Sequence, residues 1–126
     1  MKFRVLMIAA TSLLLIMLGP ALGHHSFSVE FTAEETAVIT GIVAEVWFKN
    51  PHARYYIDVQ NDDGEIERWD TRASSPSLLV RKGWTKDTIA AGDEVTIKGH
   101  VGREDKRLLS IIWIELADGR KLGQDY

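Results

Sequence analysis

The sequence predicts a mainly β protein, a five-stranded OB-fold-like Greek-key barrel with one short helix between strands 3 and 4. Five segments between residues 37 and 116 are rich in β-branched and aromatic residues or alternate apolar with polar side chains. Short turn signals separate them, and the single helix signal falls between the third and fourth segments. A lipocalin-like barrel needs more strands and an immunoglobulin sandwich needs about seven, so the five-stranded barrel is favoured.

The first two strands form a hairpin. Residues 37–48, AVITGIVAEVWF, predict a long strand in which Gly41 marks a bend or bulge. Such a bend suits a first strand that must curve to serve both halves of the barrel. The Asn-Pro pair at 50–51 predicts a turn, and residues 53–60 alternate as a second strand.

The next elements are a third strand and the helix. The Asn-Asp-Asp-Gly turn at 61–64 predicts a hairpin, and residues 65–71 predict the strand that follows it. Ser75 is a suitable N-cap, Pro76 suits the first helical position, and Gly83 ends a short helix.

The last two strands are predicted at residues 94–101 and 108–116, joined by a charged loop. A final turn at 118–119 leads to a short polar tail. With the helix between strands 3 and 4, this order favours the OB-fold-like barrel over other small β folds.

The N-terminus predicts export. Residues 1–23 read as a signal peptide because two basic residues precede an uncharged run at 5–18, which is followed by Gly-Pro and small residues. The alternative is a transmembrane anchor, but the run is short of the roughly 20 residues that span a bilayer. We therefore expect a periplasmic protein with no stable transmembrane segment after cleavage, an N-terminal arm at 24–35 and the barrel domain at 36–126.

Charge and composition limit the function. Without Lys2 and Arg4, the 15 basic residues fall to 13 against 18 acidic ones, a formal net charge of −5. This charge predicts that nucleic acid is not a partner, because nucleic-acid binders usually carry a basic footprint. The chain has no cysteine for a disulfide or lipid attachment. No nucleophile elbow or acid–base relay is recognisable, so the sequence does not predict an enzyme.

The histidines predict a metal site, with copper as the candidate cofactor. Cleavage after Gly23 would give His24 a free α-amine beside His25. His52 lies in the first hairpin loop and His100 ends the fourth strand, and in an OB-fold these loops flank one ligand-binding face. A nitrogen-rich ligand set favours Cu(II). Alternatively, the terminal pair binds metal as any such peptide does, His52 caps a turn and His100 faces solvent.

A second hypothesis is a metal-free module that binds a periplasmic or membrane protein partner. The aromatic residues on or beside the strands are more numerous than the core requires. Those left over, together with Arg54 and Arg72, would line a groove for an extended ligand, and the Trp47-Phe48 pair is the best placed of them. The aromatic residues concerned are Trp47, Phe48, Tyr55, Tyr56, Trp69, Trp84 and Trp113.

Four segments resemble the DUF6152 family of small exported bacterial proteins of unknown function. They are HHSF at 24–27, WFKNPHA at 47–53, SPSLLVRKGWT at 75–85 and DGRKL at 118–122. The resemblance covers essentially the whole mature chain and implies a periplasmic domain of a Gram-negative bacterium, without an established activity or ligand. Its pattern marks His24, His25, Asn50, Pro51, His52, Pro76, Gly83 and Trp84. The chain departs from the pattern at Arg72, where relatives often have an acidic residue, and at His100, where they often have an aromatic one.

Overall fold

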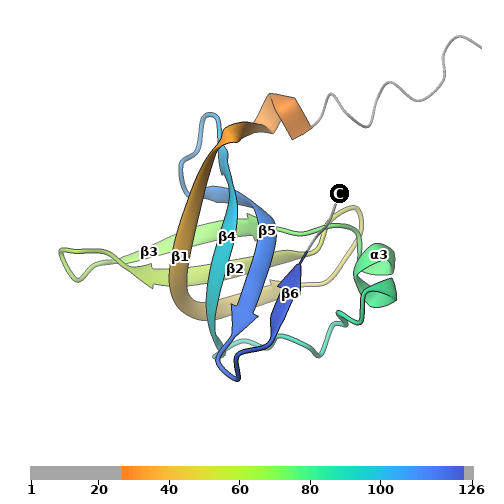
Figure 1. The fold of residues 1–126 in the computed structure, drawn as a ribbon. Coiled ribbons are helices and arrows are strands. Elements are labelled where there is room, and N and C mark those ends of the chain that lie inside the picture. The colour runs from red at the N-terminus through yellow and green to blue at the C-terminus, as the bar shows by residue number, and fades with distance from the viewer. Residues whose placement is uncertain (1–26, 124–126) are drawn as a thin grey trace, which may run out of the picture.

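The computed structural model describes residues 27–123 and shows a small barrel with the helix α3 beside it (Figure 1). Hydrogen bonds order the strands β3-β2-β1-β4-β5-β6, and a parallel pairing of β3 with β5 closes the first five into a ring. The elements are β1 Phe31–Trp47, β2 Arg54–Gln60, β3 Ile66–Arg72, α3 Pro76–Arg81, β4 Glu94–Gly102, β5 Leu108–Leu116 and β6 Lys121–Gly123. The predicted five-stranded OB-fold-like barrel with its helix between the third and fourth strands is confirmed.

The long β1 strand is shared between two partners. Its first part pairs with β4 at Phe31 and again from Thr36 to Ile42, and its last part pairs with β2 from Ile42 to Trp47. In Figure 1, β1 runs beside β4 and then curves round toward β2. The register shifts between Val43 and Glu45, so the bulge lies just beyond Gly41, where the sequence predicted a bend or bulge.

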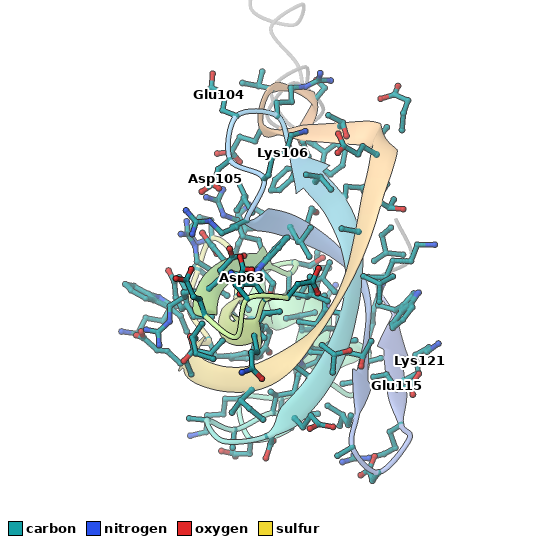
Figure 2. The ribbon with its side chains drawn as sticks, turned by 90° about the vertical axis from the view of Figure 1, so that its left-hand side faces the viewer. Asp63, Glu104, Asp105, Lys106, Glu115 and Lys121 are labelled. Atoms are coloured by element: carbon teal, nitrogen blue, oxygen red, sulfur yellow. The ribbon has the colours of Figure 1, made fainter. Side chains whose placement is uncertain are left out.

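The first strand begins earlier than predicted, and a sixth strand follows the five that were predicted. Residues 27–30 form a helical turn, and β1 starts at Phe31, inside the stretch expected to be an arm. The reason is tertiary: Phe31 is buried and pairs with Gly102, and the backbone carbonyl of Glu30 accepts a hydrogen bond from Arg103. The loop carrying Glu104 to Lys106 lies beside this turn (Figure 2). At the other end, β6 adds a short strand to β5, where the sequence predicted only a polar tail.

The core fills the barrel with alternate side chains from the strands and is completed by the segment between β3 and β4. Leu79 of α3 and Trp84 after it are fully buried, as is Ile89 in the following loop. Pro76 occupies the start of α3, and Gly83 has φ +80° just after its end, as predicted. Within residues 27–123, no helix is both long enough and apolar enough to cross a membrane.

One polar contact lies inside this core, between Tyr55 of β2 and Trp84. The indole Nε1 of Trp84 donates a hydrogen bond of 2.7 Å to the Tyr55 hydroxyl, and the two rings stack with centroids 5.9 Å apart. This hydrogen bond gives the buried indole N–H and the buried phenol oxygen a partner in a site that excludes water. Burial raises the pKa of the Tyr55 hydroxyl to about 12 from its ordinary value of 10.0, although the hydrogen bond from Trp84 opposes the shift.

We expect Tyr55 to make the protein less stable as the pH rises from 10 to 12. In this window the folded protein keeps the phenol proton while the unfolded chain releases it, so deprotonation stabilises the unfolded state. Below pH 10 the phenol is protonated in both states, and Tyr55 does not make the free energy of unfolding depend on pH. Urea unfolding across this range should show a steeper loss of stability in the native protein than in Tyr55→Phe. Equal slopes would contradict the raised pKa.

Candidate ligand-binding face of the barrel

A pocket lies where β1 passes into β2. It is a cavity of about 210 Å³ lined by Trp47, Asn50, Pro51, His52 and Arg54, and the Asn50–Pro51 peptide bond is cis. Trp47 is 44% exposed, and the Lys49 ammonium lies 5.1 Å from the centre of its ring. The pocket thus presents an aromatic face beside an imidazole and a guanidinium.

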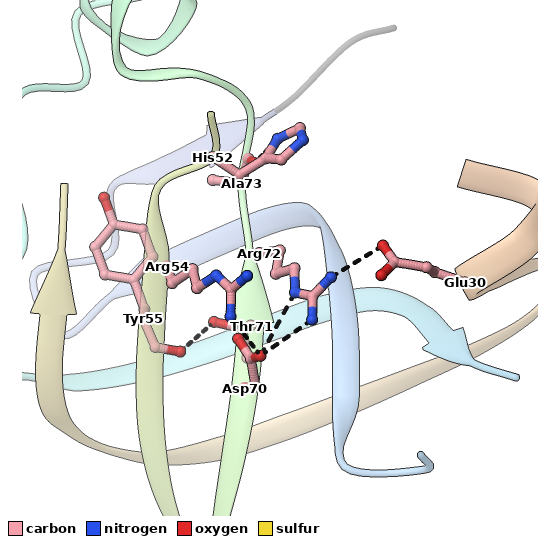
Figure 3. A network of polar contacts seen from close by, with 8 residues as sticks. All are labelled: Glu30, His52, Arg54, Tyr55, Asp70, Thr71, Arg72 and Ala73. Atoms are coloured by element: carbon pink, nitrogen blue, oxygen red, sulfur yellow. Dashed lines mark hydrogen bonds and ion pairs between the residues drawn. The ribbon is translucent and has the colours of Figure 1, made fainter. Parts of the chain in front are cut away.

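His52 is held in one orientation by the end of β3. Its Nδ1 atom lies 3.2 Å from the backbone carbonyl oxygen of Ala73. Figure 3 shows the two residues lying side by side. A carbonyl oxygen only accepts hydrogen bonds, so Nδ1 carries a proton, and in the neutral imidazole the lone pair is on Nε2. Backbone hydrogen bonds from Ala53 to Ser74 and from Ala73 to Ala53 fasten the loop to this strand end. His52 therefore offers an oriented nitrogen ligand at the pocket.

His100 lies in a different setting from the one expected. It stands on β4, opposite Thr36 of β1 and Ser110 of β5. The Phe27 ring packs against its imidazole in a T-shaped arrangement with centroids 5.5 Å apart. Its Nδ1 atom is buried and has no hydrogen-bond partner among the described residues. His100 is thus a half-buried neighbour of the N-terminal turn rather than a solvent-facing residue.

Two of the four predicted metal ligands lie within the described residues 27–123 and two lie outside them. Within residues 27–123, no three histidine, aspartate or glutamate side chains come together in a group that could hold a metal ion. His24 and His25, like the predicted signal peptide at 1–23, lie outside the described residues. Of the four predicted ligands, the structure therefore describes the surroundings of His52 and His100.

Two arginines form a network next to the pocket. Arg54 of β2 and Arg72 of β3 are cross-strand partners, so their side chains share the outer face of the barrel. Asp70 Oδ2 lies 3.3 Å from Arg54 Nη1 and 3.5 Å from Arg72 Nε. Arg72 Nη1 also donates a 2.9 Å hydrogen bond to Glu30 of the N-terminal turn (Figure 3). The sequence singled out both arginines but missed the two acids.

The aromatic residues divide between core and surface. Tyr55 and Trp84 are buried, while Phe48 and Trp69 pack against the core and Lys121 lies 4.0 Å above the ring of Trp113. Trp47 remains well exposed, and it lines the pocket. The aromatic surface that could meet a partner is therefore centred on Trp47.

The closed ring of β1 to β5, with α3 between β3 and β4, places the protein in the class of OB-fold-like barrels. The chain belongs to the DUF6152 family, a family of unknown function whose model matches residues 13–109. No curated protein sequence matches it. The predicted family is thus confirmed.

Solved structures with the same fold include two crystal structures of Rim1, a mitochondrial single-stranded DNA binding protein from S. cerevisiae. The first has a TM-score of 0.52 at 15% identity, covering 66% of this chain and 93% of that chain. The second, labelled with selenomethionine, has a TM-score of 0.50 at 14% identity, covering 72% and 97%. At this level of identity, the likeness shows the shared fold.

The prediction that nucleic acid is excluded as a partner is wrong. It rested on the acidic charge of the whole chain, yet the two solved structures above, which share this fold, are of a single-stranded DNA binding protein. Binding depends on the charges of one face rather than on the net charge. Here β2 and β3 place Arg54, Arg68 and Arg72 on the same outer face, beside Asp58 and Asp70.

Proposed function

We propose that this protein is an exported periplasmic binding protein that takes up Cu(II) through His24 and His25 at the start of the mature chain, with His52 as a further ligand. The observation that carries the proposal is the hydrogen bond between His52 Nδ1 and the Ala73 carbonyl. Histidine ligands to metals commonly donate their other ring N–H to such a carbonyl, which fixes the tautomer and the ring orientation. Imidazole and amine nitrogens together suit Cu(II).

His100 is left out of the proposed site. One of its two ring nitrogens is buried, and its ring packs against Phe27. A metal ion at this imidazole would have to compete with that packing. His52, in contrast, is exposed at the mouth of a cavity. The His100→Phe variant is therefore a matched control for the loss of one imidazole.

The test is a Cu(II) titration of the exported protein after mass spectrometry has established its first residue. We expect His52→Ala and His24→Ala each to weaken Cu(II) binding by about tenfold or more, and to change the visible circular dichroism of the bound ion. We expect His100→Phe to bind Cu(II) as the native protein does. Unchanged binding in both alanine variants would reject the proposal.

A second candidate function is supported by the exposure of Trp47 beside the same pocket. A metal-free module would use this indole to bind a protein partner in the periplasm. Trp47→Ala would then abolish cross-linking to a repeatable partner, whereas His24→Ala and His25→Ala would leave it unchanged. The two candidates are distinguished by which of these substitutions impairs binding.

A further inference from the structure

In the polar network beside the pocket, the residues that come from β2 and β3 carry more positive than negative charge. The side chains of Arg54, Arg72 and Asp70 lie together on β2 and β3, which gives two guanidinium groups to one carboxylate. Arg72 is only 20% exposed and Asp70 only 22%. A guanidinium that is largely removed from water needs an anionic partner, and Asp70 serves two of them.

The missing negative charge comes from Glu30, in a segment distant in the sequence. Glu30 Oε2 lies 2.9 Å from Arg72 Nη1, yet the glutamate side chain is 50% exposed. The turn that carries it is fastened by other contacts, since Arg103 donates to the backbone carbonyls of Ser28 and Glu30. The Phe31 ring also lies 6.0 Å from the Arg72 guanidinium. The Glu30 carboxylate can therefore swing away into water without the turn leaving the barrel.

Arg54 has binding capacity to spare. Its contact with Asp70 uses only Nη1, and its other guanidinium nitrogens have no partner among the described residues. Arg54 also lines the pocket that holds Trp47 and His52. It thus connects the charged network to the cavity.

We infer that Arg54 and Arg72 form a binding site for a phosphate group, which displaces the Glu30 carboxylate. Both guanidinium groups come from neighbouring strands at directly paired positions, so one group with several acceptor oxygens can contact both. Of the two arginines, the Glu30 carboxylate contacts Arg72. The rest of a phosphate-bearing ligand would lie in the pocket against Trp47. The Glu30 carboxylate therefore competes with the phosphate for Arg72.

The test is isothermal titration of sodium phosphate at low ionic strength, without metal, into the exported protein and three variants. We expect Glu30→Gln to bind phosphate about two- to fivefold more tightly, because it removes an exposed ion pair that the ligand must break. We expect Arg54→Gln to weaken binding by at least about tenfold, since it removes charge-assisted hydrogen bonds.

The control is Arg68→Gln, on the same face of the same two strands. Arg68 makes two hydrogen bonds to Asp58, of 2.8 and 3.0 Å, so its loss removes the same charge without touching the site. We expect phosphate to bind this variant as it binds the native protein. Equal weakening in Arg54→Gln and Arg68→Gln would overturn the inference. It would show that phosphate binding depends on the net charge of the protein and not on a site at Arg54. No gain in Glu30→Gln would also overturn it.

The source of the phosphate is distinguished by a second ligand, a short oligothymidylate. Tighter binding of the oligonucleotide than of inorganic phosphate, lost on Trp47→Ala, would assign the site to a phosphodiester whose base stacks on the indole. Equal or weaker binding would assign it to a free phosphate group. Both outcomes keep the site at Arg54 and Arg72. Since no metal is present, failure of this experiment leaves the Cu(II) proposal standing.

Discussion

Replacing Trp84 with alanine is expected to lower the free energy of unfolding by about 3–5 kcal/mol. Trp84 has the largest side chain among the fully buried residues described, and its ring stacks on Tyr55 at an interplanar angle of 29°. The substitution leaves a cavity and also removes the donor that satisfies the Tyr55 hydroxyl. Since domains of this size are stable by only about 5–15 kcal/mol, the variant would be close to unfolding.

Urea unfolding followed by far-ultraviolet circular dichroism would measure this effect without relying on tryptophan fluorescence. Trp47→Ala is the matched control, because the same side chain is removed from an exposed position. We expect it to cost less than about 1 kcal/mol. Tyr55→Phe would isolate the hydrogen bond, at about 1–3 kcal/mol. A similar cost for both tryptophans would contradict the burial of Trp84 in the core.

The positions of β2 to β5 could be predicted from the sequence because their signals are local. Alternating side chains and turn residues place each of these strands within one or two residues of its observed bounds. The helix could be placed for the same reason, since Pro76 starts it and Gly83 takes a positive φ just after it ends. These signals depend on a few neighbouring residues and not on the rest of the chain.

The ends of the barrel could not be predicted because their cause is distant in the sequence. Residues 32–36, TAEET, have no alternating pattern, and their place in β1 follows from the β4 pairings of Phe31 and Thr36 at the two ends of this stretch. The register shift between Phe31 and Thr36 reflects this irregularity. The three-residue strand β6 is likewise defined only by its pairing with β5.

The candidate site, like the fold, could be predicted from the sequence only in part. The Asn-Pro turn correctly placed His52 in the first loop, but its tautomer depends on the carbonyl of Ala73, which lies 21 residues away. The link between Arg72 and Glu30 spans 42 residues and begins in a segment that the sequence assigned to an arm. The sequence therefore identified residue types suited to binding, while their partners had to come from the fold.

Replacing Gly41 with alanine is expected to lower the free energy of unfolding by about 1–3 kcal/mol. Gly41 lies where β1 changes partners, opposite Val95 of β4 and one residue from the Ile42–Asp58 pair with β2. A methyl group here would meet the backbone carbonyl of Asp58 and lie 2.9 Å from Cγ2 of Ile57. The backbone carbonyl belongs to the β2 strand itself, so relief requires β1 and β2 to move apart.

Gly123→Ala is the matched control, because a methyl group there would meet no atom within 4 Å. We expect this control to stay within about 0.5 kcal/mol of the native protein. Amide hydrogen exchange would locate the damage: in Gly41→Ala, protection should fall at the β1–β2 pairing more than at the β4–β5 pairing. A uniform loss of protection, or equal stability of the two alanine variants, would show that β1 does not need glycine to turn from one sheet partner to the other. The expected local loss would instead mean that Gly41 serves the barrel by allowing two strands to approach closely, with the bend itself taken up by the bulge beyond it.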